Sequence, residues 1–243
     1  AKAGLKPVFA VYSSFLQRAY DQILHDVCLQ KLPVVFAIDR AGIVGKDGAT
    51  HQGIFDLSYL SSIPNLTIMA PKNKWELSDM LKFAIAADYP VAIRYPRGDA
   101  CDLWREMRAP IVQGRSEVLC EGTDVALFAI GTMVETAWKV KEQLAEREIT
   151  ATVVNARFMA PLDEKEILSA AEKYPLIVTM EENVVSGGFG EHIAALLKEH
   201  EAKVKVLPVA IENRFVEHGD VETLRRVLGI DEKTITDRIC EEL

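Results

Sequence analysis

Short apolar runs alternate with longer amphipathic stretches along the whole chain. The apolar runs are four to six residues long and rich in β-branched side chains, which is typical of strands buried on both faces. We expect strands at 7–11, 34–38, 66–69 and 91–95 in the first half, and at 125–130, 151–155, 176–180 and 204–209 in the second. The alternation predicts βα units and a mainly parallel sheet in each half.

Helices are expected between these strands, and several have recognisable ends. One begins near Ser13 or Ser14, either of which can cap it, and Asn73 opens another that runs to about residue 87. In the second half we expect helices at 133–147, 163–174, 190–201, 220–228 and 231–242, with caps at Asp163 and Asp220 and a stop at Gly229.

The stretch 96–114 lacks periodicity and contains several prolines and glycines, which is typical of a linker. We therefore expect two doubly wound, mainly parallel α/β domains, at 1–98 and 123–243, joined by a linker at 99–122. Ligands of such sheets bind at loops beyond the carboxyl ends of the strands. Three loops of the first half meet that rule and are crowded with polar side chains: 12–18, 39–53 and 94–98.

The composition mainly argues against certain classes of protein and site. The chain of 243 residues is 49% hydrophobic and can bury one large core or two modest ones. A net charge of -8 without a basic stripe argues against nucleic-acid binding. No apolar run approaches the roughly 20 residues of a membrane helix. The four cysteines are far apart and form no C-x-x-C pair, which disfavours zinc sites and disulfides and favours the cytoplasm.

The loop after the second strand carries the strongest chemical signal. It contains the string Asp47-Gly48-Ala49-Thr50-His51-Gln52-Gly53. A lone loop histidine is most often a surface residue, but the glycines around this one let the backbone approach a ligand. An imidazole can exchange protons with a reacting oxygen near neutral pH. His51 is therefore the candidate catalytic residue.

This string resembles the corresponding loop of the transketolase superfamily, where the histidine faces thiamine diphosphate and the donor substrate. The strings at 12–22, 37–42 and 94–98 narrow the resemblance to the 1-deoxy-D-xylulose-5-phosphate synthase family. The resemblance to this family is strong through residues 4–98, and it is weaker but continuous from there to the C-terminus. The resemblance implies a transferase, dependent on thiamine diphosphate and Mg²⁺, that condenses pyruvate with glyceraldehyde 3-phosphate, releases carbon dioxide and supplies isoprenoid precursors.

The resemblance also implies roles for residues around the cofactor. Phe15 would pack against the aminopyrimidine ring, and Arg18 would lie near the same ring. His51 would assist proton movements around the C2 oxygen of the intermediate. The structural alternatives are a buried Phe15 that opens a helix and an Arg18 on a solvated helix face.

Four more residues are implied for the acceptor substrate. Arg40 and Arg94 follow or end neighbouring strands and would bind the acceptor phosphate, because a guanidinium matches phosphate oxygens in charge and geometry. Tyr12 and Asp47 would complete this pocket. The alternative for each arginine is an ion pair with a nearby aspartate.

Parts of the family pattern are missing from these residues. There is no Gly-Asp-Gly motif with a downstream asparagine to hold metal and diphosphate, and no glutamate precedes Tyr12. We therefore expect a C-terminal fragment with a truncated pyrimidine-binding domain, inactive alone and binding no cofactor by itself. The family further implies a cytoplasmic homodimer without nucleic-acid or membrane partners.

Two other functions stay open. The β-subunit of a 2-oxoacid dehydrogenase joins the same two domains, although the strings at Arg18 and 94–98 favour the synthase. A non-catalytic binding or dimerisation module is the second alternative. In the second half, the pair Glu181-Glu182 and the glycines at 187–190 are interpreted as structural.

Overall fold

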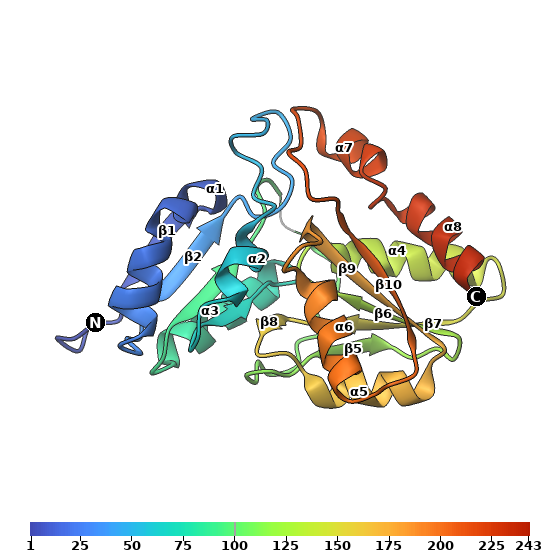
Figure 1. Ribbon diagram of the computed structural model, residues 1–243, viewed down its shortest axis with the longest axis horizontal. Helices are drawn as coiled ribbons and strands as arrows, with labels where there is room; N and C mark the ends of the chain where they lie inside the picture. The colour runs from blue at the N-terminus through green and yellow to red at the C-terminus, as the bar shows by residue number, and fades with distance from the viewer. Residues whose placement is uncertain (100) are drawn as a thin grey trace.

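The computed structural model describes residues 1–99 and 101–243 and contains two five-stranded sheets (Figure 1). The first sheet has the order β1-β2-β4-β3-β8, with β1 (Val8–Tyr12), β2 (Val35–Asp39), β3 (Thr67–Met69), β4 (Val91–Arg94) and β8 (Phe158–Ala160). The second has the order β10-β9-β6-β7-β5, with β5 (Glu117–Cys120), β6 (Val125–Ala129), β7 (Ala151–Asn155), β9 (Leu176–Val184) and β10 (Lys205–Ile211). All neighbours are parallel except β3 with β8 and β5 with β7, so the expected fold class is confirmed.

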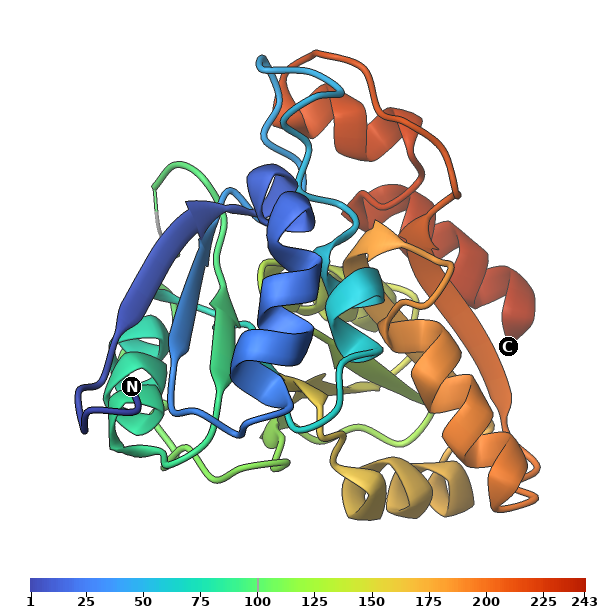
Figure 2. The same ribbon diagram turned by 60° about the vertical axis from the view of Figure 1, so that its left-hand side comes forward.

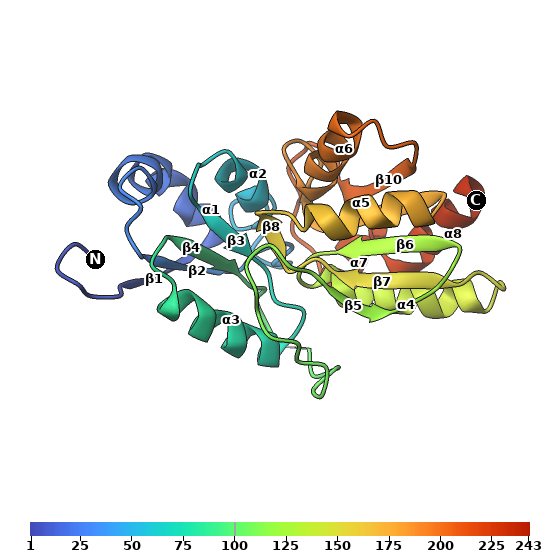
Figure 3. The ribbon, with the colours of Figure 1, turned by 90° about the horizontal axis from the view of Figure 1, so that it is seen from below.

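Helices cover both faces of each sheet, as Figure 3 shows. In the first half α3 (Lys74–Ala86) lies on one face, and α1 (Ser13–Leu16) and α2 (Asp56–Ser61) lie on the other. The expected helix at Ser13 continues beyond α1 as a 3₁₀ turn (Gln17–Ala19) and a π-helix (Gln22–Cys28). The second half adds α4 (Met133–Ala145), α5 (Glu164–Lys173), α6 (Phe189–Glu199), α7 (Val221–Val227) and α8 (Glu232–Glu242).

Three helix ends follow the predicted capping chemistry. The cap expected at Ser13 or Ser14 is wrong, because α1 begins at Ser13 and the preceding Tyr12 stands at the cap position without a side-chain hydrogen bond. Asn73 accepts a hydrogen bond from the Glu76 amide at 2.8 Å, and Asp220 accepts one from the Thr223 amide at 2.9 Å. Asp163 caps α5 in the same way. Each cap satisfies a backbone N–H that has no partner within its helix, which fixes where the helix begins.

Three elements were outside the sequence prediction: α2, β5 and β8. The strand β5 lies inside the range 99–122 that we expect to be a linker, and Ala100 of that range lies outside the described residues. The strand β8 comes from the second half but pairs antiparallel with β3 of the first sheet, Met69 lying opposite Phe158. Elements of three to six residues are too short for a period to show in the sequence.

The apolar core continues from one half of the chain into the other. One cluster of buried side chains includes Leu16 and Ile38 from the first half together with Phe128 and Ile193 from the second. The strands β6 and β9 are buried along their whole length, as a sheet covered on both faces requires. In the described part of the chain, no helix is long and apolar enough to cross a membrane.

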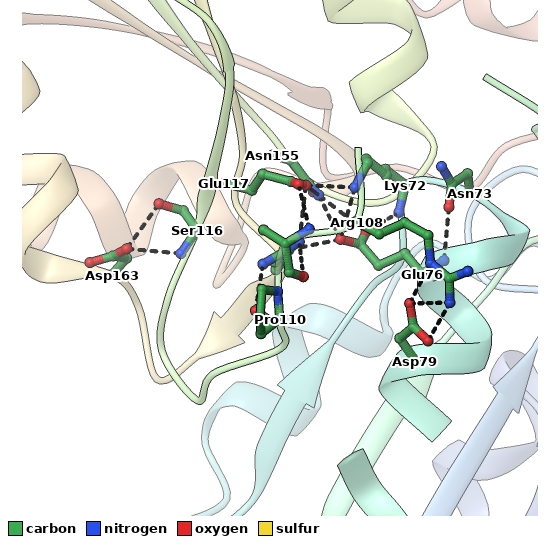
Figure 4. A network of polar contacts seen from close by, with 12 residues as sticks. Lys72, Asn73, Glu76, Asp79, Arg108, Pro110, Ser116, Glu117, Asn155 and Asp163 are labelled. Atoms are coloured by element: carbon green, nitrogen blue, oxygen red, sulfur yellow. Dashed lines mark hydrogen bonds and ion pairs between the residues drawn. The ribbon is translucent and has the colours of Figure 1, made fainter. Parts of the chain in front are cut away.

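A buried network of charged side chains also joins the two halves (Figure 4). Lys72 Nζ lies 3.2 Å from Glu76 Oε1 and 2.5 Å from Glu117 Oε2. Arg157 reaches the same two carboxylates, at 2.7 Å through Nε and 3.0 Å through Nη2. Asn155 Nδ2 donates to both as well. Burial raises the pKa of Glu117, but the hydrogen bond from Lys72 and the two nearby cations outweigh it and hold that pKa below its usual value.

Candidate functional site

The predicted site residues lie at the carboxyl ends of β1 and β2. Tyr12 ends β1 and stands opposite Asp39 of β2, so the two following segments leave the sheet at one edge. The first segment is α1 with Phe15, and the second is the loop 40–53, which we call the histidine loop. Figure 2 shows this loop above the sheet edge, near α1. Arg40, Asp47 and His51 all belong to it.

Aromatic rings form a row along this edge. The ring centroids of Tyr12 and Phe15 are 5.4 Å apart, and those of Phe15 and His51 are 5.3 Å apart. The guanidinium of Arg18 lies 5.9 Å from the centre of the Phe15 ring. Phe15 is 41% exposed. The structure therefore brings these four predicted residues together, and the Phe15 ring remains accessible.

An open groove of about 480 Å³ runs beside this row. Its lining comes from α1 and the following 3₁₀ turn, from the histidine loop, from the start of α2 and from the second half of the chain: Ser14, Phe15, Gln17, Arg18, Ala49, Thr50, Gln52, Phe55 and Phe215. The Phe55 and Phe215 rings pack edge to face, with centroids 6.1 Å apart. A flat aromatic ligand fits such a groove, because exposed aromatic rings and a guanidinium offer it stacking surfaces.

A second cluster joins two arginines to one aspartate. Arg40 Nη1 lies 2.6 Å from Asp47 Oδ2, and Arg97 Nη1 lies 3.1 Å from the same oxygen. The Arg40 guanidinium also lies 4.0 Å from the centre of the Tyr12 ring. Arg97 was not among the predicted residues, although it belongs to the quoted string 94–98. Sequence spacing alone does not reveal which of two arginines three residues apart reaches the cluster.

Arg94 lies in different surroundings from Arg40, which corrects the expectation that the two side chains converge. It is 5% exposed, and its Nε donates to Asp56 Oδ2 at 3.0 Å. Its Nη2 donates to the carbonyl oxygens of Gly53 and Glu182, at 3.3 and 3.4 Å. The reason is register: Arg94 pairs with the buried residue Ile38, two positions before Arg40. Its guanidinium therefore forms a buried ion pair with Asp56.

The base of the histidine loop is closed and attached to β9. Gly42 and Gly53 exchange two backbone hydrogen bonds, of 2.7 and 2.8 Å. Glu182 accepts from the Ile43 amide at 3.1 Å and from Arg225 Nε at 2.8 Å. A Cβ atom on Gly42 would lie only 2.0 Å from Glu182 Oε2, so this close approach requires glycine.

Glu181, the neighbour of Glu182, is buried at the start of α6. Its carboxylate accepts hydrogen bonds from the amides of Phe189 and Gly190, at 2.8 and 2.9 Å. Burial raises the pKa of Glu181 to about 7, even though these two hydrogen bonds act in the opposite direction. The contacts agree with the structural interpretation of the pair Glu181-Glu182.

We expect Glu181 to make the stability of the chain fall as the pH rises. The pKa of about 7 in the folded chain exceeds the ordinary value of 4.5, so the folded state holds this proton more tightly. The contribution of Glu181 to the free energy of unfolding is complete below pH 4.5 and is lost as the pH rises through 7. At its full size this contribution is about 3 kcal/mol. Urea unfolding at a series of pH values should show this slope for the native chain and not for Glu181→Gln.

Glu191→Gln is the matched control, because Glu191 accepts from the Gly187 amide at the same end of α6 but is exposed. It should keep most of the native slope, because burial is the largest cause of the raised pKa of Glu181 and the nearby charge of Glu191 contributes least. Parallel curves for the native chain and Glu181→Gln would contradict the assignment, whatever the difference in their absolute stabilities.

Within 1–99 and 101–243, no three His, Cys, Asp or Glu side chains lie close enough together to hold a metal ion. The described residues therefore offer no cluster of metal ligands for a metal-bound diphosphate, whereas the groove beside Phe15 offers stacking surfaces to a flat aromatic ring.

Comparison with known families assigns both halves of the chain. Residues 1–101 match the family described as transketolase, pyrimidine binding domain, and residues 114–235 match the family described as transketolase, C-terminal domain. A solved structure described as a split gene transketolase, inactive beta4 tetramer, has a TM-score of 0.90 at 28% identity, covering 99% of this chain and 77% of that one. The transketolase of Campylobacter jejuni shares the fold, with a TM-score of 0.74 at 20% identity over 97% of this chain and 35% of that one.

Curated relatives are more similar in sequence. The 1-deoxy-D-xylulose-5-phosphate synthase of Lachnoclostridium phytofermentans is 54% identical over 243 residues, which are 100% of this chain and 39% of that protein. The synthase of Caldanaerobacter subterraneus subsp. tengcongensis is 51% identical over 99% of this chain and 39% of that protein. The chain therefore spans 39% of the length of these two relatives.

Proposed function

Because this chain belongs to the transketolase family, we propose that it forms part of a 1-deoxy-D-xylulose-5-phosphate synthase. The reaction would condense pyruvate with glyceraldehyde 3-phosphate and release carbon dioxide. The observation that carries the proposal is the row Tyr12, Phe15 and His51, which lies at one sheet edge beside the Arg40–Asp47 pair. This arrangement supports the proposal, because one ligand at this edge would meet an aromatic surface, a proton-exchanging group and an arginine. The named relatives support the choice of substrates.

Phe15 and Arg18 are the residues that would hold the aminopyrimidine ring of thiamine diphosphate. Phe15 offers an exposed ring face, and Arg18 lies 5.9 Å from its centre. When bound, this cofactor supplies the carbanion chemistry that side chains lack. The protein residues then orient the reacting groups and exclude water.

His51 would exchange a proton with a substrate oxygen. Its Nδ1 lies 2.9 Å from Thr50 Oγ1, and in the described part of the chain its Nε2 forms no hydrogen bond. Nε2 is therefore the nitrogen that can donate to or accept from the substrate. The neighbouring Phe15 ring fixes the orientation of the imidazole by edge-to-face packing.

Arg40 would bind the acceptor phosphate, and the structure supports Arg97 as the second arginine in place of Arg94. Both converge on Asp47, and both are accessible, with side-chain exposures of 21% and 47%. The Arg40 guanidinium also packs on the Tyr12 ring. Arg94 would instead position the base of the histidine loop, because its guanidinium donates to the Gly53 carbonyl oxygen.

We propose that the remaining functions come from segments outside these residues and from a second copy. The described residues contain no cluster of three His, Cys, Asp or Glu side chains for a metal ion, and the curated relatives are longer than this chain. Magnesium binding and cofactor activation would then require those further segments. A homodimer, as in the family expectation, belongs to the same proposal.

A test compares this chain alone with the same sequence inside a protein as long as its curated relatives. The longer protein should release carbon dioxide from pyruvate only when glyceraldehyde 3-phosphate is present, and the 243-residue chain should release none. Turnover by the 243-residue chain would contradict the proposal that metal binding and cofactor activation require further segments. Transfer of an acetyl group to a lipoyl acceptor would instead favour the 2-oxoacid dehydrogenase β-subunit.

A further inference from the structure

Two loops from opposite halves of the chain lie side by side at the top of Figure 1. One is the histidine loop, and the other is the segment 212–220, which connects β10 to α7 and which we call the bracing loop. The Gly219 amide donates to the Gly45 carbonyl oxygen at 3.3 Å. A Cβ atom on Gly45 would lie 2.9 Å from Gly219 O, so the two backbones are in direct contact. The bracing loop therefore packs against the very segment that carries Asp47 and His51.

Gln52 is the side chain that connects these loops. It is 1% exposed, although it follows the half-buried His51 directly. Its Oε1 accepts from the Val44 amide at 2.8 Å and from the Gly45 amide at 3.4 Å. Its Nε2 donates to the Glu217 carbonyl oxygen at 2.9 Å. The side-chain amide of Gln52 thus satisfies two backbone N–H groups of the turn within the histidine loop, and it also joins that turn to the bracing loop.

Besides Gln52, other contacts hold the histidine loop at its base, where Glu182 accepts from the Ile43 amide, and at Asp47, which pairs with Arg40 and Arg97. The base is also held by Gly42 and Gly53, but Lys46, Ala49 and Thr50 near the tip of the loop are exposed. A catalytic group on such a loop needs a rigid neighbour, because a displacement of about 1 Å can cost roughly a hundredfold in rate. The side-chain amide of Gln52 joins the histidine loop to the bracing loop, which Val216 anchors in the core of the second half.

We propose that Gln52 is a positioning residue, through which the second half of the chain holds His51 in place. Both hydrogen-bonding ends of the amide are needed: the acceptor shapes the turn, and the donor attaches it to Glu217 O. The catalytic consequence rests on the proposed function. The mechanical link between the two loops does not, and it can be tested on the 243-residue chain.

Gln52→Glu separates the two ends of the side chain. At neutral pH the carboxylate keeps the acceptor for the Val44 amide but places a second acceptor against Glu217 O, so the link between the loops is lost. Protonation at mildly acidic pH restores a donor, and the link should return. Gln52→Met keeps a similar volume but neither end, so acid should not rescue it. Gln30→Glu is the control, because Gln30 is exposed and only donates to the Asp26 carbonyl oxygen.

Amide hydrogen exchange on this chain measures the link directly, relative to the native chain at the same pH. We expect exchange in 44–52 and 216–219 to be roughly tenfold to a hundredfold faster in Gln52→Glu at neutral pH and to approach the native rate in mild acid. The Gln52→Met chain should remain fast in both conditions, and Gln30→Glu should match the native chain. Unchanged exchange in Gln52→Glu, or losses equal to Gln52→Met at every pH, would overturn the proposal.

A second measurement addresses the effect on His51. In the longer protein, Gln52→Glu should lower kcat by roughly tenfold or more at neutral pH and recover activity in mild acid, relative to the native enzyme. A loss of kcat with no acid recovery would overturn the positioning role. The exchange experiment needs no substrate. It therefore still tests the link between the loops if the proposed reaction turns out to be wrong.

Discussion

Replacing Arg157 by methionine should lower the free energy of unfolding of this chain by about 3–5 kcal/mol. Arg157 is 1% exposed and contacts both buried carboxylates of the network, Glu76 and Glu117. Without it, Lys72 alone faces two negative charges that water does not reach. Chemical denaturation, followed by circular dichroism, measures the loss.

Two comparisons show whether the loss comes from uncompensated charge. Adding Glu117→Gln to Arg157→Met leaves one cation and one carboxylate and should recover part of the stability. Arg147→Met removes a solvated partner of Asp237 and should leave stability nearly unchanged. A loss below about 1 kcal/mol for Arg157→Met would show that the network does not stabilise the chain. A large loss without recovery in the double variant would show that the loss does not come from uncompensated charge.

Replacing Arg40 by alanine in the longer protein should raise the Michaelis constant for glyceraldehyde 3-phosphate by roughly tenfold to a hundredfold. The phosphate would lose a charge-assisted contact, whereas pyruvate would lose nothing. Arg97→Ala should act in the same direction. Arg40→Lys should recover only part, because a point charge does not reproduce the guanidinium fork. An unphosphorylated aldehyde acceptor should show little effect in any of the three.

Arg94→Ala is the discriminating variant. Its partner Asp56 is fully buried, so we expect a loss of stability that does not depend on which acceptor is used. A selective loss of the phosphorylated acceptor in Arg94→Ala, with none in Arg40→Ala, would reverse the assignment made from the geometry. If Arg40→Ala weakened the use of both acceptors equally, Arg40 would not be the residue that binds the acceptor phosphate.

Much of the fold could be predicted from the sequence, because its main strands are continuous apolar runs with capped helices between them. The expected strand at 151–155 agrees with β7 residue for residue, and the cap at Asn73 is present. The short strands β5 and β8 could not be predicted. Their pairing depends on neighbours far away in the sequence, and Arg157, just before β8, adopts a φ of 60° that local propensity disfavours.

The site was predicted less completely than the fold. The order of the strands placed Tyr12, Phe15, Arg40 and His51 at one edge, and their side chains do meet there. Arg94 shows the limit of such reasoning, because the end of a strand does not reveal the register with its neighbour: Arg94 lies level with the buried Ile38, two positions before Arg40. The roles of Arg97 and Gln52 depend on contacts with Asp47 and Glu217 that no spacing rule reveals.

The pairing of β3 with β8 delays the completion of the first sheet while the protein is being synthesised. The first sheet is complete only after Phe158–Ala160 has been synthesised, about 90 residues after β3. At about 5–20 residues per second this corresponds to a wait of roughly 5–20 s. Throughout that interval, the edge of Thr67–Met69 has backbone groups without their final partner. The first half therefore cannot finish folding as a separate unit on the ribosome, and its completion is tied to the emergence of the second half.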